Sequence, residues 1–145
     1  MWAQTEANTR KRLMIREDDT TPIILVVEDV AETREGIEKL LKADGYCVVV
    51  ARDERDAIES AQLRHPDLIL VSLAGLPDDV IVSARRIREH ANAGEKVPVV
   101  LFCIEGIGEG KEVAIGQNVH LTRPDNFNQL RRLLTRLLHK VPMAA

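Results

Sequence analysis

Two adjacent carboxylates, Glu28 and Asp29, directly follow an aliphatic run from Ile23 to Val27. Neighbouring carboxylates repel each other unless a cation or a basic side chain lies close to them. Mg²⁺ binds one or two protein carboxylates and keeps several waters, so the pair predicts a magnesium site. The same two residues could instead complement the dipole at the start of a helix. The residues alone leave both interpretations open.

A hydroxyl side chain, Ser72, ends a second aliphatic run from Leu68 to Val71. Such a continuous run is typical of a strand that is buried on both faces. Serine is a weak nucleophile unless a neighbouring base activates it, and it offers a metal no negative charge. Ser72 could also be only a small residue at the end of a strand.

Aliphatic runs alternate with helix-type patterns along most of the chain. Five of each predict the α/β class, specifically a flavodoxin-like doubly wound (βα)5 sandwich with a five-stranded parallel sheet in the order 2-1-3-4-5. A glycine-rich stretch predicts a fourth helix that is short, late and mobile. The expected strands are 23–27, 46–51, 68–73, 97–103 and 119–122, the glycine-rich stretch is 105–110, and the last helix begins near residue 126.

This strand order determines where polar residues can meet. The switch point of the sheet lies between its first and third strands, so residues just after Val27 and Val71 converge on one pocket. Residues after Phe102 and Leu121 flank that pocket. The acidic pair and Ser72 are therefore expected to lie together.

The overall composition is that of one ordinary domain. The chain has 145 residues and a net charge of -3, so nucleic acid is not expected as a partner, and no apolar run is long enough to span a membrane. We expect a flexible N-terminal tail over 1–21, a domain over 22–141 and a C-terminal tail over 142–145. Two separate cysteines, Cys47 and Cys103, and no secretion signal predict a reduced, cytoplasmic protein.

The ordered set of segments resembles the receiver domain of response regulators in two-component signalling. The similarity extends over about residues 23–140, and its individual motifs are less specific than their order. It is carried by Ile24–Asp29, Arg34, Gly45–Tyr46, Pro66–Leu70, Arg85–Glu89, Val97–Val100 and Leu121–Pro124.

The resemblance implies roles that this chain keeps only in part. In receiver domains an acidic pair holds Mg²⁺, an aspartate ending the third strand accepts a phosphoryl group, a threonine or serine ends the fourth strand, and a lysine before a cis-proline ends the fifth. Here the acidic pair is kept, but the acceptor position is occupied by serine. The matching positions are Glu28 and Asp29 for the pair, Ser72 for the acceptor, Cys103 for the hydroxyl, Arg123 and Pro124 for Lys-Pro, and His120 for the aromatic switch residue.

These substitutions predict a degenerate receiver that is not an enzyme. We expect at most a weak or vestigial Mg²⁺ site at Glu28 and Asp29, and no other cofactor. The Arg123 side chain is expected to reach that pair and to replace the cation. The predicted function is that of a stand-alone phosphorelay signalling domain that works by protein–protein interaction without conventional aspartate phosphorylation.

The expected partners are a histidine kinase, another regulator or an effector, docked on the face between the fourth and fifth helices. The last helix carries more apolar residues than one core contact needs, which allows a homodimer through that helix. Its basic residues are expected to form a solvated face.

Other interpretations remain for particular residues and for the whole chain. Cys103 could be a redox-sensitive thiol or a small buried residue, and His120 a pH switch or a filler of the aromatic slot. The chain could be a receiver regulated by noncanonical phosphorylation or by phosphate or Mg²⁺ binding. It could also be a flavodoxin-like cofactor-binding module, although the acidic loop after the first strand would repel a phosphate. A phosphatase or dehalogenase would need a nucleophilic aspartate at a strand end.

Overall fold

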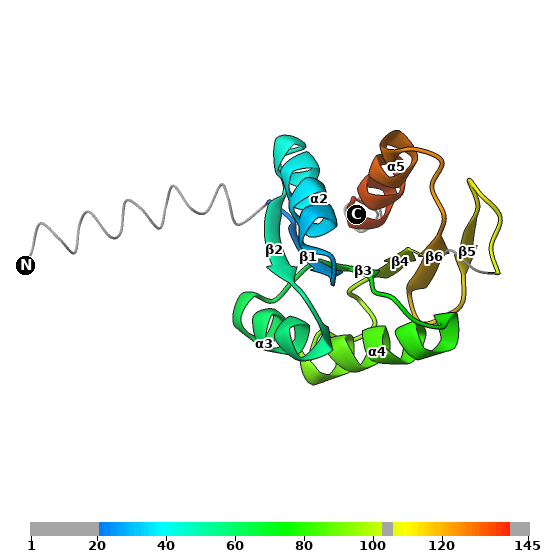
Figure 1. The fold of residues 1–145 in the computed structure, drawn as a ribbon. Helices are drawn as coiled ribbons and strands as arrows, with labels where there is room; N and C mark the ends of the chain where they lie inside the picture. Colours follow the sequence, from blue (N-terminus) through cyan, green and yellow to red (C-terminus); the bar gives the residue numbers. More distant parts are fainter. Residues whose placement is uncertain (1–20, 103–105, 140–145) are drawn as a thin grey trace, which may run out of the picture.

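Strands and helices alternate through most of the chain in the computed structural model, which describes residues 21–102 and 106–139 (Figure 1). The strands are β1 (Ile23–Glu28), β2 (Cys47–Ala51), β3 (Leu68–Ser72), β4 (Val99–Phe102), β5 (Glu112–Ala114) and β6 (Val119–Thr122). The helices are α2 (Ala31–Ala43), α3 (Glu54–Arg64), α4 (Pro77–His90) and α5 (Phe127–Leu138). The predicted tails, apart from Thr21, lie outside the described residues.

The sheet has the order β2-β1-β3-β4-β6-β5, and every neighbouring pair is parallel except β5 with β6. Helices α2 and α5 cover one face, and α3 and α4 cover the other (Figure 1). The predicted aliphatic runs form its centre, where Leu68 to Val71 are fully buried. The burial of the central strands by helices on both faces of the sheet confirms the α/β class and the doubly wound arrangement.

The fourth crossover differs from the expectation of a fourth helix and a purely parallel sheet. The five parallel strands have the predicted order, but the edge strand β5 is added beside β6 and runs antiparallel to it. In the part of the chain between β4 and β6 that the structure describes, 106–118, there is no helix. Three glycines, Gly106, Gly108 and Gly110, disfavour a helix there because glycine loses more backbone entropy than other residues on becoming helical.

A tight turn connects this glycine-rich loop to β5. The Lys111 N–H donates to the Gly108 oxygen at 3.0 Å, and Gly110 has φ +78°, as position i+2 of a type II turn requires. The Gly110 N–H donates to Arg123 O at 2.6 Å, and the Arg123 N–H donates to Lys111 O at 3.1 Å. Two residues of one strand thus oppose one residue of the other, which is a β-bulge.

The same turn is attached to the start of α5. The side-chain amide of Gln129 donates to Gly110 O at 2.6 Å, and its oxygen accepts from the Asp125 N–H at 2.7 Å. Asn126 caps the helix by accepting from the Gln129 N–H at 3.0 Å. Residue 110 therefore links β5, β6 and α5.

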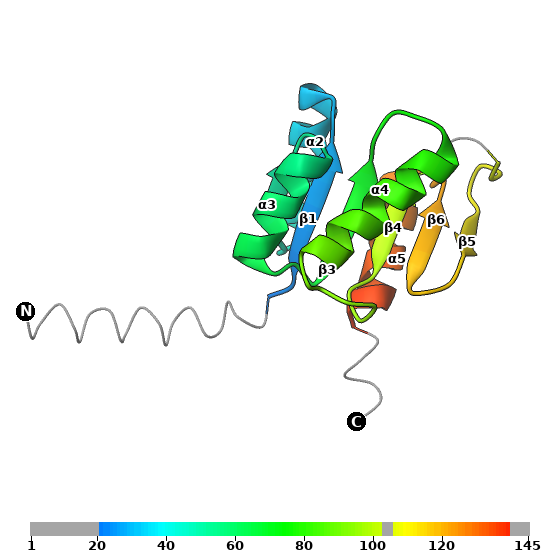
Figure 2. The same cartoon turned by 90° about the horizontal axis from the view of Figure 1, so that it is seen from below.

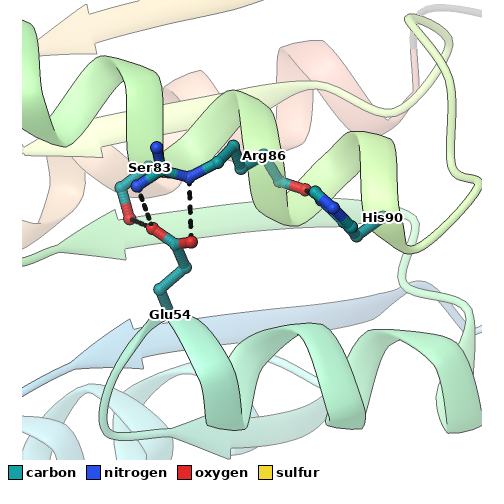
Figure 3. Close-up of polar contacts among 4 residues, drawn as sticks. All are labelled: Glu54, Ser83, Arg86 and His90. Atoms are coloured by element: carbon teal, nitrogen blue, oxygen red, sulfur yellow. Dashed lines mark hydrogen bonds and ion pairs between the residues drawn. The ribbon is translucent and has the colours of Figure 1, made fainter.

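A polar contact holds α4 against α3 on the other face of the sheet (Figure 3). Glu54, in the first turn of α3, accepts two hydrogen bonds from the Arg86 guanidinium, at 2.9 Å and 2.8 Å. Ser83 donates to the same carboxylate at 2.6 Å. Farther along, Gln62 donates to His90 O at 3.0 Å. These contacts fix the side of α4 that faces α3.

The apolar residues of α5 are used within the domain. Leu130, Leu133, Leu134 and Leu137 are buried, and Phe127 and Leu138 pack against the same cluster. None of the exposed large apolar residues of the described chain lies on α5. The surplus of apolar surface that suggested a homodimer through this helix is therefore absent, and such a dimer stays a prediction without that support.

None of the described helices combines the length and the apolarity that crossing a membrane requires.

We predict that Gly110→Ala destabilises the domain more than Gly106→Ala. Both glycines have nearly the same positive φ, +78° and +79°, so each substitution should cost about 1–2 kcal/mol for the left-handed backbone. A Cβ at Gly106 meets nothing within 4 Å, whereas at Gly110 it lies 2.7 Å from Asp125 Oδ2, which must move. Urea unfolding of both variants checks this. Equal losses of stability would show that the turn adapts without cost.

The contact between Glu54 and Arg86 predicts a pH dependence of stability. Hydrogen bonds from Arg86 hold the pKa of Glu54 below its ordinary value. The stabilisation is therefore complete above the ordinary glutamate pKa and is lost as the pH falls through the lowered one. Glu54→Gln should unfold at a lower urea concentration than wild type at neutral pH, and the difference should shrink in acid. Glu59→Gln, on the exposed side of the same helix, is the control. A difference that does not change with pH would contradict this role.

Candidate functional site

Two neighbouring strands bring an acid and a hydroxyl together at the carboxyl edge of the sheet. Glu28 ends β1 and Ser72 ends β3, and the two residues are direct partners in the parallel register. The Ser72 hydroxyl donates to Glu28 Oε1 at 2.8 Å. The predicted convergence of these two positions is therefore seen, and the serine is bonded to the acidic pair.

Both oxygens of the Glu28 carboxyl have a hydrogen-bond donor. The second, Oε2, accepts from the Val30 N–H at 3.0 Å, and the residue is only 4% exposed. The Arg34 side chain donates to the main-chain oxygen of Glu28 at 2.8 Å. The turn from β1 into α2 is thus held by its own side chains.

Asp29 is the exposed member of the pair. Its Oδ2 accepts from the Ala74 N–H at 3.4 Å, which ties the loop after β3 to the end of β1. The pocket therefore consists of a buried carboxyl group, an exposed carboxylate and one hydroxyl group between two loops.

The two acids have pKa values that are shifted in opposite directions. Burial raises the pKa of Glu28, and the neighbouring Asp29 raises it further, although hydrogen bonds from Val30 and Ser72 oppose this. A hydrogen bond with the Glu28 carboxyl group lowers the pKa of Asp29. As the pH falls, Glu28 is therefore the member that takes up a proton first, and the negative charge stays on the exposed Asp29.

These residues fit a divalent cation poorly. Glu28 and Asp29 would hold it, and a cation there would neutralise their charge, but both Glu28 oxygens already accept hydrogen bonds from Ser72 and Val30. Within the described ranges no group of three or more His, Cys, Asp or Glu residues could hold a metal ion. Weak Mg²⁺ binding at the pair stays a prediction.

Arg123 contacts the glycine-rich loop. Its guanidinium donates to Ile107 O at 3.3 Å. The expectation that it replaces the cation at Glu28 and Asp29 stays a prediction. The next residue, Pro124, is half-buried, and its preceding peptide bond is trans.

The remaining predicted positions are only partly visible. His120 lies on β6, half-buried, with Nε2 2.9 Å from Asn118 Oδ1. Cys103 lies outside the described residues, so its role as thiol or core residue stays open. The sequence did not predict the hydrogen bonds from the main-chain N–H groups of Val30 and Ala74, because main-chain groups leave no mark on the residue types. It also did not predict the hydrogen bond from Arg34 to the Glu28 main chain, although an arginine in the first turns of a helix after the acidic pair could have suggested that contact.

Comparisons with known proteins find similarity to response regulators and to sensor histidine kinases. No model of a known protein family matches the chain. It is 31% identical over 127 residues to the sensor histidine kinase AruS of Pseudomonas aeruginosa, covering 84% of this chain and 12% of that protein. It is 29% identical over 119 residues to the response regulator PhoP of the same species, covering 81% of this chain and 52% of that protein. The chain thus spans about half of one relative and a small part of the other.

Solved structures give the same picture. The chemotaxis protein CheY4 of Vibrio cholerae superposes with a TM-score of 0.65 at 25% identity, covering 81% of this chain and 99% of that one. The receiver domain of the sensor histidine kinase PA1611 of Pseudomonas aeruginosa gives 0.62 at 28% identity, covering 82% and 98%. That receiver domain has a magnesium ion coordinated in its active-site cleft.

We predict that Glu28→Gln raises stability at neutral pH. The raised pKa of Glu28 means that the native state favours the protonated form, so wild-type stability should fall as the pH rises from the ordinary glutamate pKa through the raised one. Glutamine is neutral and can still accept from the Val30 N–H. Thermal unfolding across this pH range should show the decline in wild type and its loss in the variant, with Glu35→Gln on the exposed side of α2 as control. A variant less stable than wild type at neutral pH would contradict this.

Proposed function

We propose that this chain, a homologue of response regulators and of histidine-kinase receiver domains with the receiver fold, works in two-component signalling as a docking domain whose output does not depend on aspartate phosphorylation. The observation that carries the proposal is the Ser72 hydroxyl, which ends β3 and donates to Glu28 at 2.8 Å. The partner would be a histidine kinase, another regulator or an effector.

The chemistry of the β3 position supports this proposal. Phosphoryl transfer to a receiver-type pocket needs an ionised carboxylate as nucleophile and positive charge to stabilise the transferred group. Ser72 supplies a hydroxyl group whose proton is already engaged with Glu28. Its neutral side chain also leaves a metal with one anionic ligand fewer than an aspartate would provide.

The charge around the pocket also supports the docking proposal. The Arg34 side chain donates to the main-chain oxygen of Glu28, and the Arg123 side chain donates to Ile107 O. Asp29 keeps its negative charge at the mouth of the pocket, because its pKa is lowered. An incoming phosphoryl group would therefore meet the negative charge of this carboxylate, which disfavours its approach.

A second candidate function is favoured by the same hydrogen bond. A serine that donates to a carboxylate of raised pKa has the geometry of a nucleophile with its general base, so Ser72 could itself accept a phosphoryl group. The base would take the hydroxyl proton while the serine oxygen attacks phosphorus and the donor leaves. This candidate needs a cation to stabilise the transferred group, and it is therefore the weaker of the two.

The test is the intact mass of the protein after incubation with acetyl phosphate and Mg²⁺. We expect no adduct on wild type and a partial adduct on Ser72→Asp, because the aspartate restores both the nucleophile and the third carboxylate. A stoichiometric phosphate adduct on wild type would overturn the docking proposal. Its loss in Ser72→Ala would then establish the second candidate, and its persistence there would place the acceptor elsewhere.

A further inference from the structure

One stretch of the sheet lacks a covering helix. A parallel crossover is usually made by a helix that packs on the sheet. Here the described part of the fourth crossover instead forms β5, in the plane of the sheet. Figure 2 shows α4 crossing obliquely over β4, with only its N-terminal end near β6, while the rest of β6 and β5 is crossed by no helix on this side.

Apolar side chains line this uncovered stretch. Val113 and Leu121 are direct partners across β5 and β6. Leu121 packs on the core cluster beneath α3 and α4, and Val113 is 44% exposed. The neighbouring Glu112 points to the opposite face, where it pairs with Arg136 of α5 at 2.7 Å. The pairing and the alternation therefore place Val113 and Leu121 together on the side of α4.

The flank of α4 beside β6 adds a basic side chain, Arg85. The buried Arg88 donates to Val97 O at 3.0 Å and Asn118 O at 3.4 Å, which places this flank next to the start of β6. Ile81 and Arg85 lie on the same flank at helical spacing, and Ile81 packs on the same core cluster. The Arg85 Nε is buried and has no hydrogen-bond acceptor within the described ranges 21–102 and 106–139.

We propose that these four residues, Ile81, Arg85, Val113 and Leu121, form a docking surface for an amphipathic helix of a partner protein. The apolar stripe of that helix would cover Val113 and Leu121, and a carboxylate on its edge would accept from Arg85. The incoming helix would occupy the place that a crossover helix would otherwise take. The inference rests on the proposed docking function and names the surface it uses.

Charge and strand length favour a partner helix over two other binding modes, which are a second copy of this chain and a strand added to the edge of the sheet. A second copy docked symmetrically would bring Arg85 close to its own equivalent, and like charges disfavour this. Addition of a partner strand to the free edge of β5 is disfavoured because β5 has only three residues, begins with the charged Glu112 and directly follows the charged Lys111. A helix that carries an acidic residue meets neither obstacle.

The test is selection from a displayed library of single helices, each about 14 residues or about 21 Å long, with randomised residues along one face. Wild-type protein is the target, and Val113→Lys is used for counter-selection because this exposed position tolerates substitution. We expect enriched helices with apolar residues three and four positions apart and an Asp or Glu on the edge. Repeating the selection on Arg85→Glu should replace that acid by Lys or Arg, while Leu63→Lys on α3 should leave the enriched set unchanged.

Three results would overturn the inference. They are failure to enrich helices over the Val113→Lys background, enriched helices that do not respond to Arg85→Glu, and a wild-type dimer in sedimentation that Val113→Lys abolishes. Circular dichroism of each variant establishes that it is folded before selection. Because the phosphodonor experiment does not involve this surface, failure of the docking surface and failure of the proposed function give different results.

Discussion

The in-register pairing of β1 with β3 is the constraint on which the pocket depends. It places the last residues of the two strands, Glu28 and Ser72, side by side, so their side chains must be compatible with each other. The strands leading to them are fully buried, and this removes water from the Glu28 carboxyl group. A buried carboxyl group needs hydrogen-bond donors, and the Ser72 hydroxyl and the Val30 N–H provide them. The pocket is thereby satisfied without a ligand.

This internal satisfaction explains why the site keeps its acidic pair but differs in chemistry from an aspartate-bearing receiver. An aspartate at position 72 would add a third negative charge and would need a cation for balance. Serine instead donates a hydrogen bond, and Asp29 carries the remaining charge at the surface. Under the docking proposal, the side chain at position 72 decides which of two chemistries this backbone supports.

The second constraint is the glycine-rich fourth crossover. Its turn at Gly110 leads into an edge strand, the main chain of Arg123 is bonded to this turn, and the Arg123 guanidinium donates to Ile107 O. The loss of a helix on this side also leaves Val113 exposed beside α4. A single local change in backbone preference therefore alters the surface through which the domain could bind a partner.

Sequence patterns predicted what depends on burial and missed what depends on local turns. The aliphatic runs from Ile23 and from Leu68 indicated strands buried on both faces, and the alternation of five strands with helices indicated the parallel sheet and its order. They also placed Glu28 next to Ser72. The glycines near residue 108 signalled an irregular fourth crossover, but not that it would pair as a strand with β6. The apolar residues of α5 were mistaken for exposed surface because the sequence alone does not show how much of a helix the sheet covers.

The most direct test of the central claim is a Mg²⁺ titration followed by the backbone amide signals of Asp29, Val30, Ser72 and Ala74. If the Ser72 hydroxyl satisfies Glu28, millimolar Mg²⁺ should leave these signals unshifted in wild type and should shift them saturably in Ser72→Asp. Saturable shifts of the same size in wild type would contradict the account, because they would show that the carboxylates exchange their internal hydrogen bonds for a metal ion.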